Sequence, residues 1–224
     1  MAANLLIESL ESRTLLSGNP ANIALNATVR ADHVQIRADL LKFRSDAFGN
    51  HSRLLSDVRA IKADHVKDAT TVLPLIAKFR ADEKTVRSQL NIDRLGQRQV
   101  ELADESVIVG DLKKIALDKG NATLLTADRA QLLTDRIKLQ TDLVAGLDAR
   151  VATRQTGIAT LDADMLAIVT AAQTDPNASP KLVADLQKAV TDKTNGFNTL
   201  TADLQTLVAD RTKLIADLTA MQTA

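Results

Sequence analysis

Apolar residues recur at spacings of three and four along most of the chain, and the pattern is clearest near its end. Between Leu200 and Met221, a stripe of leucines advances by threes and fours, and Arg211 occupies the one position that interrupts it. An average spacing of 3.5 residues places these side chains along one side of an α-helix, as in helices that pack lengthwise on other helices. Weaker versions of the pattern fill the rest of the chain. We therefore predict an all-α fold of long amphipathic helices without strands.

Aspartates form a second periodic series. Asp203, Asp210 and Asp217 lie seven residues apart beside the leucine stripe, and elsewhere successive members are separated by seven, eleven or sums of the two. Such mixed steps keep a series on one face of a helix while relaxing its supercoil. The exceptions are steps of ten at 118–128 and at 175–185. We interpret the series as a solvated edge that flanks the packing seam.

Turn signals divide the chain into about four helices. Lys119-Gly120-Asn121 combines a helix stop with a cap for the next helix. A loop-forming stretch starts at Asp175 and ends with Ser179, which suits a helix cap, and Pro180, which suits the first turn. Pro74 marks a third boundary, which the aspartate spacing does not support. The predicted helices span about 22–71, 74–118, 122–173 and 181–222, with a kink allowed at 48–50.

Short connections between long helices favour antiparallel neighbours, because a parallel return needs a linker as long as the helix. We predict an elongated antiparallel helical bundle or coiled coil over residues 21–224. We expect Arg129, Arg136 and Arg211 to reach outward, where neighbouring aspartates hold their charged ends. A parallel oligomer is the alternative, because Asp32 and Asp39 precede arginines by five residues, a spacing that pairs charges across parallel chains. The leucines expected in the seams are Leu125, Leu132, Leu139, Leu204, Leu207, Leu214 and Leu218.

Residues 1–20 differ from the rest of the chain. Their apolar run is too short for a signal-peptide core or a transmembrane segment. The stretch 10–17, LESRTLLS, resembles the L-E-P-R-x-L-L-S motif near the start of many planctomycete proteins that are thought to be exported or surface-associated, with Ser12 in place of Pro. The resemblance implies an exported or surface location, with the cytoplasm as the alternative. We expect this sorting-like segment to be poorly packed and dispensable for folding. The matching residues are Leu10, Glu11, Arg13, Leu15 and Leu16.

Composition narrows the class of protein further. The chain is 45% hydrophobic, which favours folding over disorder, but only 2% aromatic, which is typical of helices that meet along narrow seams. Its 28 basic and 28 acidic residues balance, so bulk charge attracts neither nucleic acid nor an anionic membrane. The absence of Cys excludes disulfides, thiolate metal sites and thiol nucleophiles.

The residues that could carry chemistry are dispersed. His33, His51 and His65 are 18 and 14 residues apart, which on one helix is roughly 27 Å and 21 Å, too far for a shared metal ion. Asp162 and Asp164 form the tightest pair of aspartates, but on a helix they point in nearly opposite directions. No nucleotide-binding or nucleophile motif occurs. We predict no enzyme, no catalytic residue, no cofactor and no metal site.

The sequence leaves three functions open. The leading hypothesis is a structural, spacer or scaffold protein that acts through coiled-coil contacts and self-association or one protein partner. The second is a lipid-surface or stress-protection protein, because eleven-residue amphipathic repeats resemble those of exchangeable apolipoproteins and late-embryogenesis-abundant proteins. The third is an adaptor that binds a partner helix in a groove.

Overall fold

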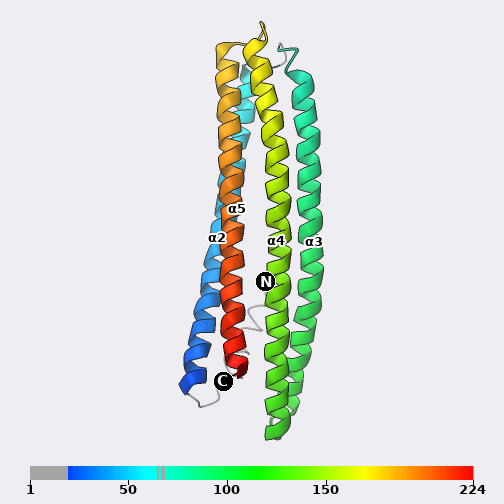
Figure 1. Cartoon of the computed structure of the whole chain (residues 1–224), viewed down its shortest axis with the longest axis vertical. Coiled ribbons are helices and arrows are strands. Elements are labelled where there is room, and N and C mark those ends of the chain that lie inside the picture. Colours follow the sequence, from blue (N-terminus) through cyan, green and yellow to red (C-terminus); the bar gives the residue numbers. More distant parts are fainter. Residues whose placement is uncertain (1–19, 65, 67–68, 224) are drawn as a thin grey trace. The chain divides into compact units, whose positions relative to one another are not determined.

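The computed structural model describes residues 20–64, 66 and 69–223, and over this range the chain is an all-α helical bundle (Figure 1). The helices α2 (Pro20–Ala63), α3 (Leu73–Leu117), α4 (Ala122–Thr174) and α5 (Pro180–Thr223) pack against one another, with no strand among the described residues. This confirms the predicted fold class. The sorting-like residues Leu10, Glu11, Arg13, Leu15 and Leu16 lie outside the described residues.

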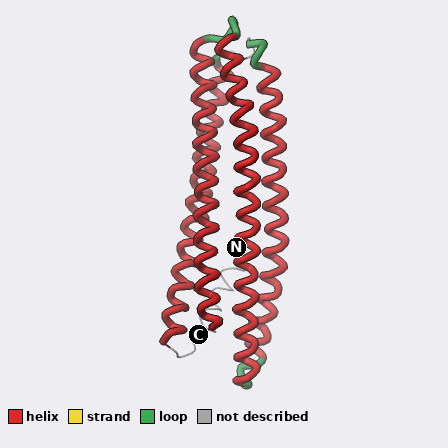
Figure 2. Tube along the Cα trace, viewed as in Figure 1, coloured by secondary structure: helices red, strands yellow, loops and turns green. Residues whose placement is uncertain are grey.

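Two of the three helix connections are tight turns with side-chain caps (Figure 2). Before α4, Oδ1 of Asn121 accepts hydrogen bonds from the backbone N–H groups of Thr123 and Leu124, both at 3.2 Å. Before α5, Oγ of Ser179 accepts a hydrogen bond from the N–H of Leu182 at 3.0 Å. These bonds satisfy donors that a helix start leaves unpaired, so the breaks lie where the Gly, Asn, Ser and Pro signals place them.

The first helix ends earlier than the sequence predicts. α2 stops at Ala63, short of the expected end near Thr71, and α3 begins at Leu73. Between them, Ala69 and Val72 are fully buried, and Thr71 donates hydrogen bonds from its N–H (3.1 Å) and hydroxyl (2.6 Å) to Asp175. Contacts that are distant in sequence therefore hold this connection out of the helical conformation.

The described chain divides into two compact units, each built from parts of all four helices. Unit 1 contains α2 up to Ala38, Leu95–Leu147 and α5 from Thr206 onward. Unit 2 contains Asp39–Arg94 and Asp148–Gln205.

Antiparallel pairing is evident inside each unit. In unit 2, Lys181 on α5 contacts Asp64, the residue directly after α2, and Lys188, seven residues further on, contacts Asp57 on α2, seven residues back. In unit 1, α3 and α4 run in opposite directions in the same way: Gly146 faces Gln97, and Lys138 contacts Asp104. The predicted antiparallel arrangement of neighbours is therefore found in both units.

The apolar seams supply the core. In unit 1, Ile108, Ile115 and Leu132 form a buried cluster, against which Leu125 and Leu139 pack with partial exposure. The unit 2 cluster joins the connection before α3 to α4 and α5. Its buried members are Ala69, Val72, Ile168, Val169, Ala172, Leu182 and Leu186. Leu204, Leu207, Leu214 and Leu218 are all buried, as the stripe on α5 predicts.

Glycine permits close helix contact at two points on α4. In unit 2, a Cβ atom added to Gly157 would lie 2.6 Å from Cγ1 of Val86 on α3. In unit 1, one added to Gly146 would lie 2.7 Å from Cγ of Gln97. Both distances are shorter than van der Waals contact, so only glycine fits without displacing the neighbouring side chain. Gly49 on α2, in contrast, faces open space, and the helix continues through it.

Candidate functional site

Six lysines share one arrangement, which we call a lysine clip. Each contacts the aspartate four residues further along its own helix and a second aspartate on the antiparallel neighbour. Within each clip the lysine side chain is 57–68% exposed, whereas the cross-helix aspartate is at most 10% exposed. The clip lysines are Lys42, Lys78, Lys138, Lys181, Lys188 and Lys213.

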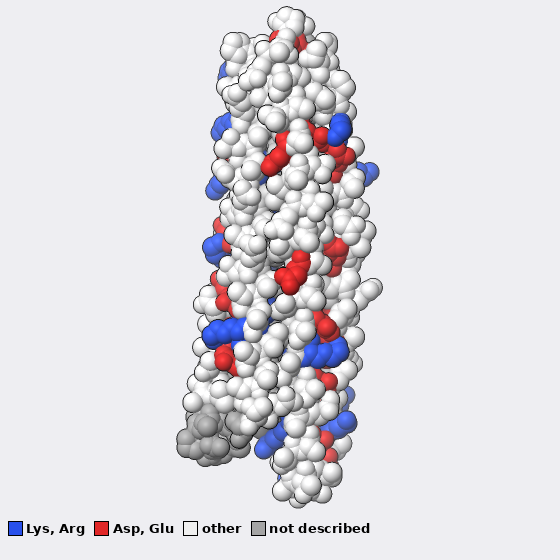
Figure 3. Space-filling model, in the orientation of Figure 1, with Lys and Arg blue, Asp and Glu red and all other residues white. Residues whose placement is uncertain are grey.

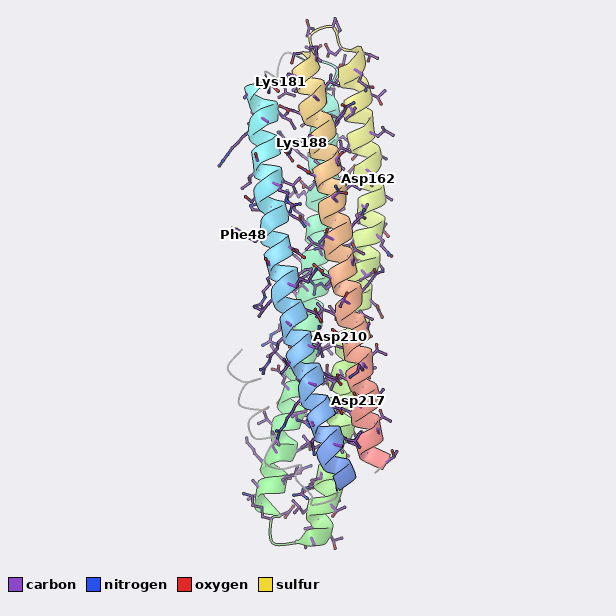
Figure 4. The ribbon with its side chains drawn as sticks, turned by 90° about the vertical axis from the view of Figure 1, so that its left-hand side faces the viewer. Phe48, Asp162, Lys181, Lys188, Asp210 and Asp217 are labelled. Atoms are coloured by element: carbon purple, nitrogen blue, oxygen red, sulfur yellow. The ribbon has the colours of Figure 1, made fainter. Side chains whose placement is uncertain are left out.

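Unit 2 contains clips on both antiparallel seams. Between α5 and α2, Nζ of Lys188 lies 2.5 Å from Asp57 and 2.6 Å from Asp192. Figure 4 shows Lys181 and Lys188 along this seam, and the seven residues between them make two turns of α5. Between α3 and α4, Lys78 contacts Asp82 and Asp164 in the same way. Contact with two carboxylates raises the pKa of Lys188 and Lys78, so both remain charged at neutral pH.

Unit 1 repeats the arrangement. Nζ of Lys138 on α4 lies 2.6 Å from both Asp104 on α3 and Asp142 on its own helix. Lys213 on α5 contacts Asp32 on α2 and lies 3.2 Å from Asp217. The clips thus connect α2 to α5 and α3 to α4 in both units. Figure 3 shows acidic and basic side chains interspersed on the visible surface, as such pairing requires.

The prediction that the aspartate series forms a solvated edge is wrong for half of the clip carboxylates. Those four residues after a lysine are partly exposed, but the cross-helix ones, such as Asp32, Asp57 and Asp104, are buried beside the seam. A buried carboxylate needs a compensating charge, and the clip lysine provides it from the surface. The aspartate series therefore contains side chains with two different structural roles, which its spacing alone does not distinguish.

Arg136 and Arg211 point inward, which contradicts the outward orientation predicted from their charge, and Arg129 is half-buried. Arg136 on α4 is buried, and burial lowers its pKa to about 10. Arg211 on α5 donates from Nη1 to Oε1 of the buried Gln140 at 2.5 Å, and burial lowers its pKa as well. Arg154, in unit 2, has its pKa lowered to about 10 by the same cause. Polar layers thus interrupt the apolar core of both units.

Among the described lysines of unit 2, Lys193 on α5 is the most buried. Its ammonium lies 2.5 Å from Glu83 on α3, 4.3 Å from the ring centroid of Phe79 and 5.8 Å from that of Phe197. Burial lowers its pKa, while Glu83 and the two rings stabilise the charged form. Sequence reasoning missed this group, although Phe197 four residues after Lys193 is a visible signal. Because the ammonium group of Lys193 is already paired with the carboxylate of Glu83, we assign Lys193 a structural role.

One position on the α3–α4 seam of unit 1, seven residues before Lys138, has glutamine in place of the lysine. Gln131 stands four residues before Asp135 and donates to it at 2.8 Å, in the position that lysine occupies in the clips. Asp135 faces Asp111 on α3, whose nearest recorded cation is Lys114 at a marginal 4.0 Å. Burial, followed by the hydrogen bond with Asp135, raises the pKa of Asp111 to about 6. This carboxyl group titrates closer to neutral pH than an ordinary aspartate.

The candidate metal and acid–base residues do not assemble. His33 is partly buried, and burial and Arg211 lower its pKa; His51 is exposed, and His65 lies outside the described residues. Asp162 accepts a hydrogen bond from the hydroxyl of Thr194, whereas Asp164 belongs to the Lys78 clip. In the described part of the chain, no three His, Asp or Glu side chains are grouped so that they could hold a metal ion.

A hollow between α4 and α5 in unit 2 has a volume of about 310 Å³. Its lining contains amide, hydroxyl and apolar side chains but no ionisable group. The lining residues are Gln155, Ile158, Asn198, Thr201, Ala202 and Gln205. It therefore offers hydrogen bonds but no acid–base pair.

The chain matches no family model, no curated protein and no solved structure. Within residues 20–64, 66 and 69–223, none of the helices has a stretch both long and apolar enough to cross a membrane.

Proposed function

We propose that this chain is a non-enzymatic structural protein, a spacer or scaffold that is exported or surface-associated and acts through coiled-coil contacts. The observation that carries the proposal is the repetition of the lysine clip along α2–α5 and α3–α4 in both units. Each clip commits three ionisable side chains to holding two helices in register. A chain that uses its charges in this way is suited to keeping its helices aligned.

The proposed location depends on the resemblance of residues 10–17 to the planctomycete motif. If the resemblance is meaningful, deletion of residues 1–20 should move the protein away from the cell surface in its own host. The same deletion should leave the thermal unfolding curve nearly unchanged. A large loss of stability would instead indicate that Leu15 and Leu16 are core residues and that the resemblance is coincidental.

The experiment that separates this function from a lipid-surface role is circular dichroism of dilute protein with and without vesicles. A scaffold should unfold cooperatively with the same midpoint in both conditions, because its apolar seams are already filled by its own helices. A lipid-surface protein should gain helix only when vesicles are present. Helix that depends on lipid would contradict the proposal.

An adaptor function is the second candidate, because α2 leaves large apolar side chains exposed. Such a face can receive a partner helix without any change in the bundle.

A further inference from the structure

The outer face of α2 in unit 2 carries a line of exposed large apolar residues. Leu41, Phe48 and Leu55 are spaced by seven and are 65%, 77% and 44% exposed. In Figure 4, Phe48 projects from α2 on the side opposite α5. Seven residues are two helical turns, so the three side chains form one line on the surface. We call them the α2 outer line.

Small residues lie beside this line. Ser45 and Ser52 follow Leu41 and Phe48 by four residues and are exposed, and Gly49 has open space where a Cβ would be. Alternating large and small positions let a second helix approach closely and insert its own side chains. A helix that lies in a lipid surface needs a broad apolar face, and this narrow line with serines beside it does not provide one.

The charges around the line have one sign. Among the positions three or four residues from its members there is no Asp or Glu, but there are arginines, including Arg44 and Arg59, and His51. Arg44 and Arg59 are exposed, and neither forms an ion pair within the described residues. The α2 aspartates that join the clips of unit 2, such as Asp57, face α5. The flanks of the line therefore present uncompensated positive charge.

We propose that the α2 outer line docks an amphipathic helix of another protein whose flanking positions are rich in Asp and Glu. The inference rests on the proposed scaffold function, because it names the class of partner for its coiled-coil contacts. Charge complementarity selects this occupant: acidic side chains of the partner helix would pair with Arg44 and Arg59, which lie beside the line. A second copy of this chain would bring only basic or neutral side chains opposite these arginines.

The test uses the full chain and two synthetic four-heptad helical peptides with the same alternating Leu and Ala seam. One peptide has Glu at the flanking positions and the other has Lys. Fluorescence anisotropy at low ionic strength should show saturable binding of the Glu peptide and at least ~10-fold weaker binding of the Lys peptide. Phe48→Ser should weaken binding of the Glu peptide at least ~10-fold, because it removes the central anchor.

The control is Leu166→Ser on α4, because Leu166 is also in unit 2 and is 66% exposed. It should leave binding unchanged. The variant with both Arg44→Glu and Arg59→Glu should reverse the preference in favour of the Lys peptide. These side chains are exposed, so circular dichroism should show unchanged unfolding for all variants.

Several results would overturn the inference. These are failure of the Glu peptide to bind, equal affinity for both peptides, or equal losses from Phe48→Ser and Leu166→Ser. Binding to anionic phosphatidylserine vesicles that requires Phe48, without binding to the Glu peptide, would assign the line to a lipid surface. Concentration-dependent dimerisation that Phe48→Ser abolishes would assign it to a second copy. A cooperative, lipid-independent unfolding curve without peptide binding refutes this inference and leaves the scaffold function standing.

Discussion

The contact between Arg211 and the buried Gln140 in unit 1 allows a quantitative test of how the bundle tolerates charge in its seam. Nη1 of Arg211 donates to Oε1 of Gln140 at 2.5 Å, and Gln140 is buried. Burial lowers the pKa of Arg211, which shows that the charged form is disfavoured at this position, while Glu101 favours it. Gln140 is thus a neutral acceptor that partly offsets the desolvation of a cation.

Replacing Gln140 alone should change the free energy of unfolding more than replacing Arg211 alone. Gln140→Leu removes the acceptor but leaves the guanidinium in place, and a hydrogen bond to a charged group contributes about 1.5–3 kcal/mol. We expect a loss of ~2–3 kcal/mol in the free energy of unfolding. Arg211→Leu leaves an unpaired amide, at ~1–3 kcal/mol, but buries a leucine, which gains ~1.5–3 kcal/mol, so its net effect should be small.

The double variant should be at least as stable as the original chain, because replacing a buried polar pair with apolar residues is often neutral or stabilising. The measurement is urea unfolding followed by circular dichroism, in which the pairwise coupling is the departure from additivity. Gln155→Leu, at an exposed position of α4, is the matched control and should change little. If the two single effects simply add, the residues are not coupled and the argument fails.

Three further predictions test other parts of the structure by thermal or urea unfolding. Gly49→Ala should stabilise the chain by ~0.5–1 kcal/mol, because alanine favours helix and the site is open, whereas Gly157→Ala should destabilise it, because the added methyl group would meet α3; equal effects would contradict the assigned close contact. Asp111 keeps its proton to a higher pH in the folded state than in the unfolded state, so the original chain should lose stability as the pH rises from about 4 to 6. Asp111→Asn should remove this loss and therefore stabilise the chain above pH 6, and an unchanged pH profile would refute the prediction. Asp175→Ala should lower the melting temperature at pH 7 by removing the acceptor for Thr71 and Asn177, and the deficit should shrink in acid, because these hydrogen bonds hold the pKa of Asp175 below its usual value; a deficit that persists at low pH would indicate another cause.

The packing seams could be predicted from the sequence because they depend on spacing alone. Leu207 and Leu214 are buried because their 3.5-residue stripe faces another helix. Local signals such as Asn121 and Ser179 set two of the helix starts. The end of α2 could not be predicted in this way. The stretch after Ala63 contains no Gly or Pro before Pro74, and the contact that holds it, between Thr71 and Asp175, joins residues 104 positions apart.

Only one of the two contacts in each lysine clip could be predicted from the sequence. A lysine four residues before an aspartate, as in Lys188 and Asp192, is a recognisable helical pair. Which distant aspartate completes the clip depends on the alignment of two helices, which periodicity does not determine. The orientation of Arg211 is ambiguous in the sequence for a related reason: its place in the leucine stripe indicates an inward side chain, whereas its charge indicates an outward one, and in the structure the side chain points inward.

The polar groups inside the bundle help to explain how a repetitive sequence selects one alignment. Leucines spaced by seven would still meet leucines if α4 and α5 slipped by one heptad, so the apolar seam alone discriminates weakly. Exposed charge pairs contribute only ~0–1 kcal/mol each, and salt weakens them further. A slip of seven residues would instead place Gln140 opposite Leu204 or Leu218 and leave Arg211 buried against apolar side chains. We expect the desolvation cost of that guanidinium to exceed what one clip can recover, so the polar layer should fix the register of α4 against α5, a pair that none of the six clips connects.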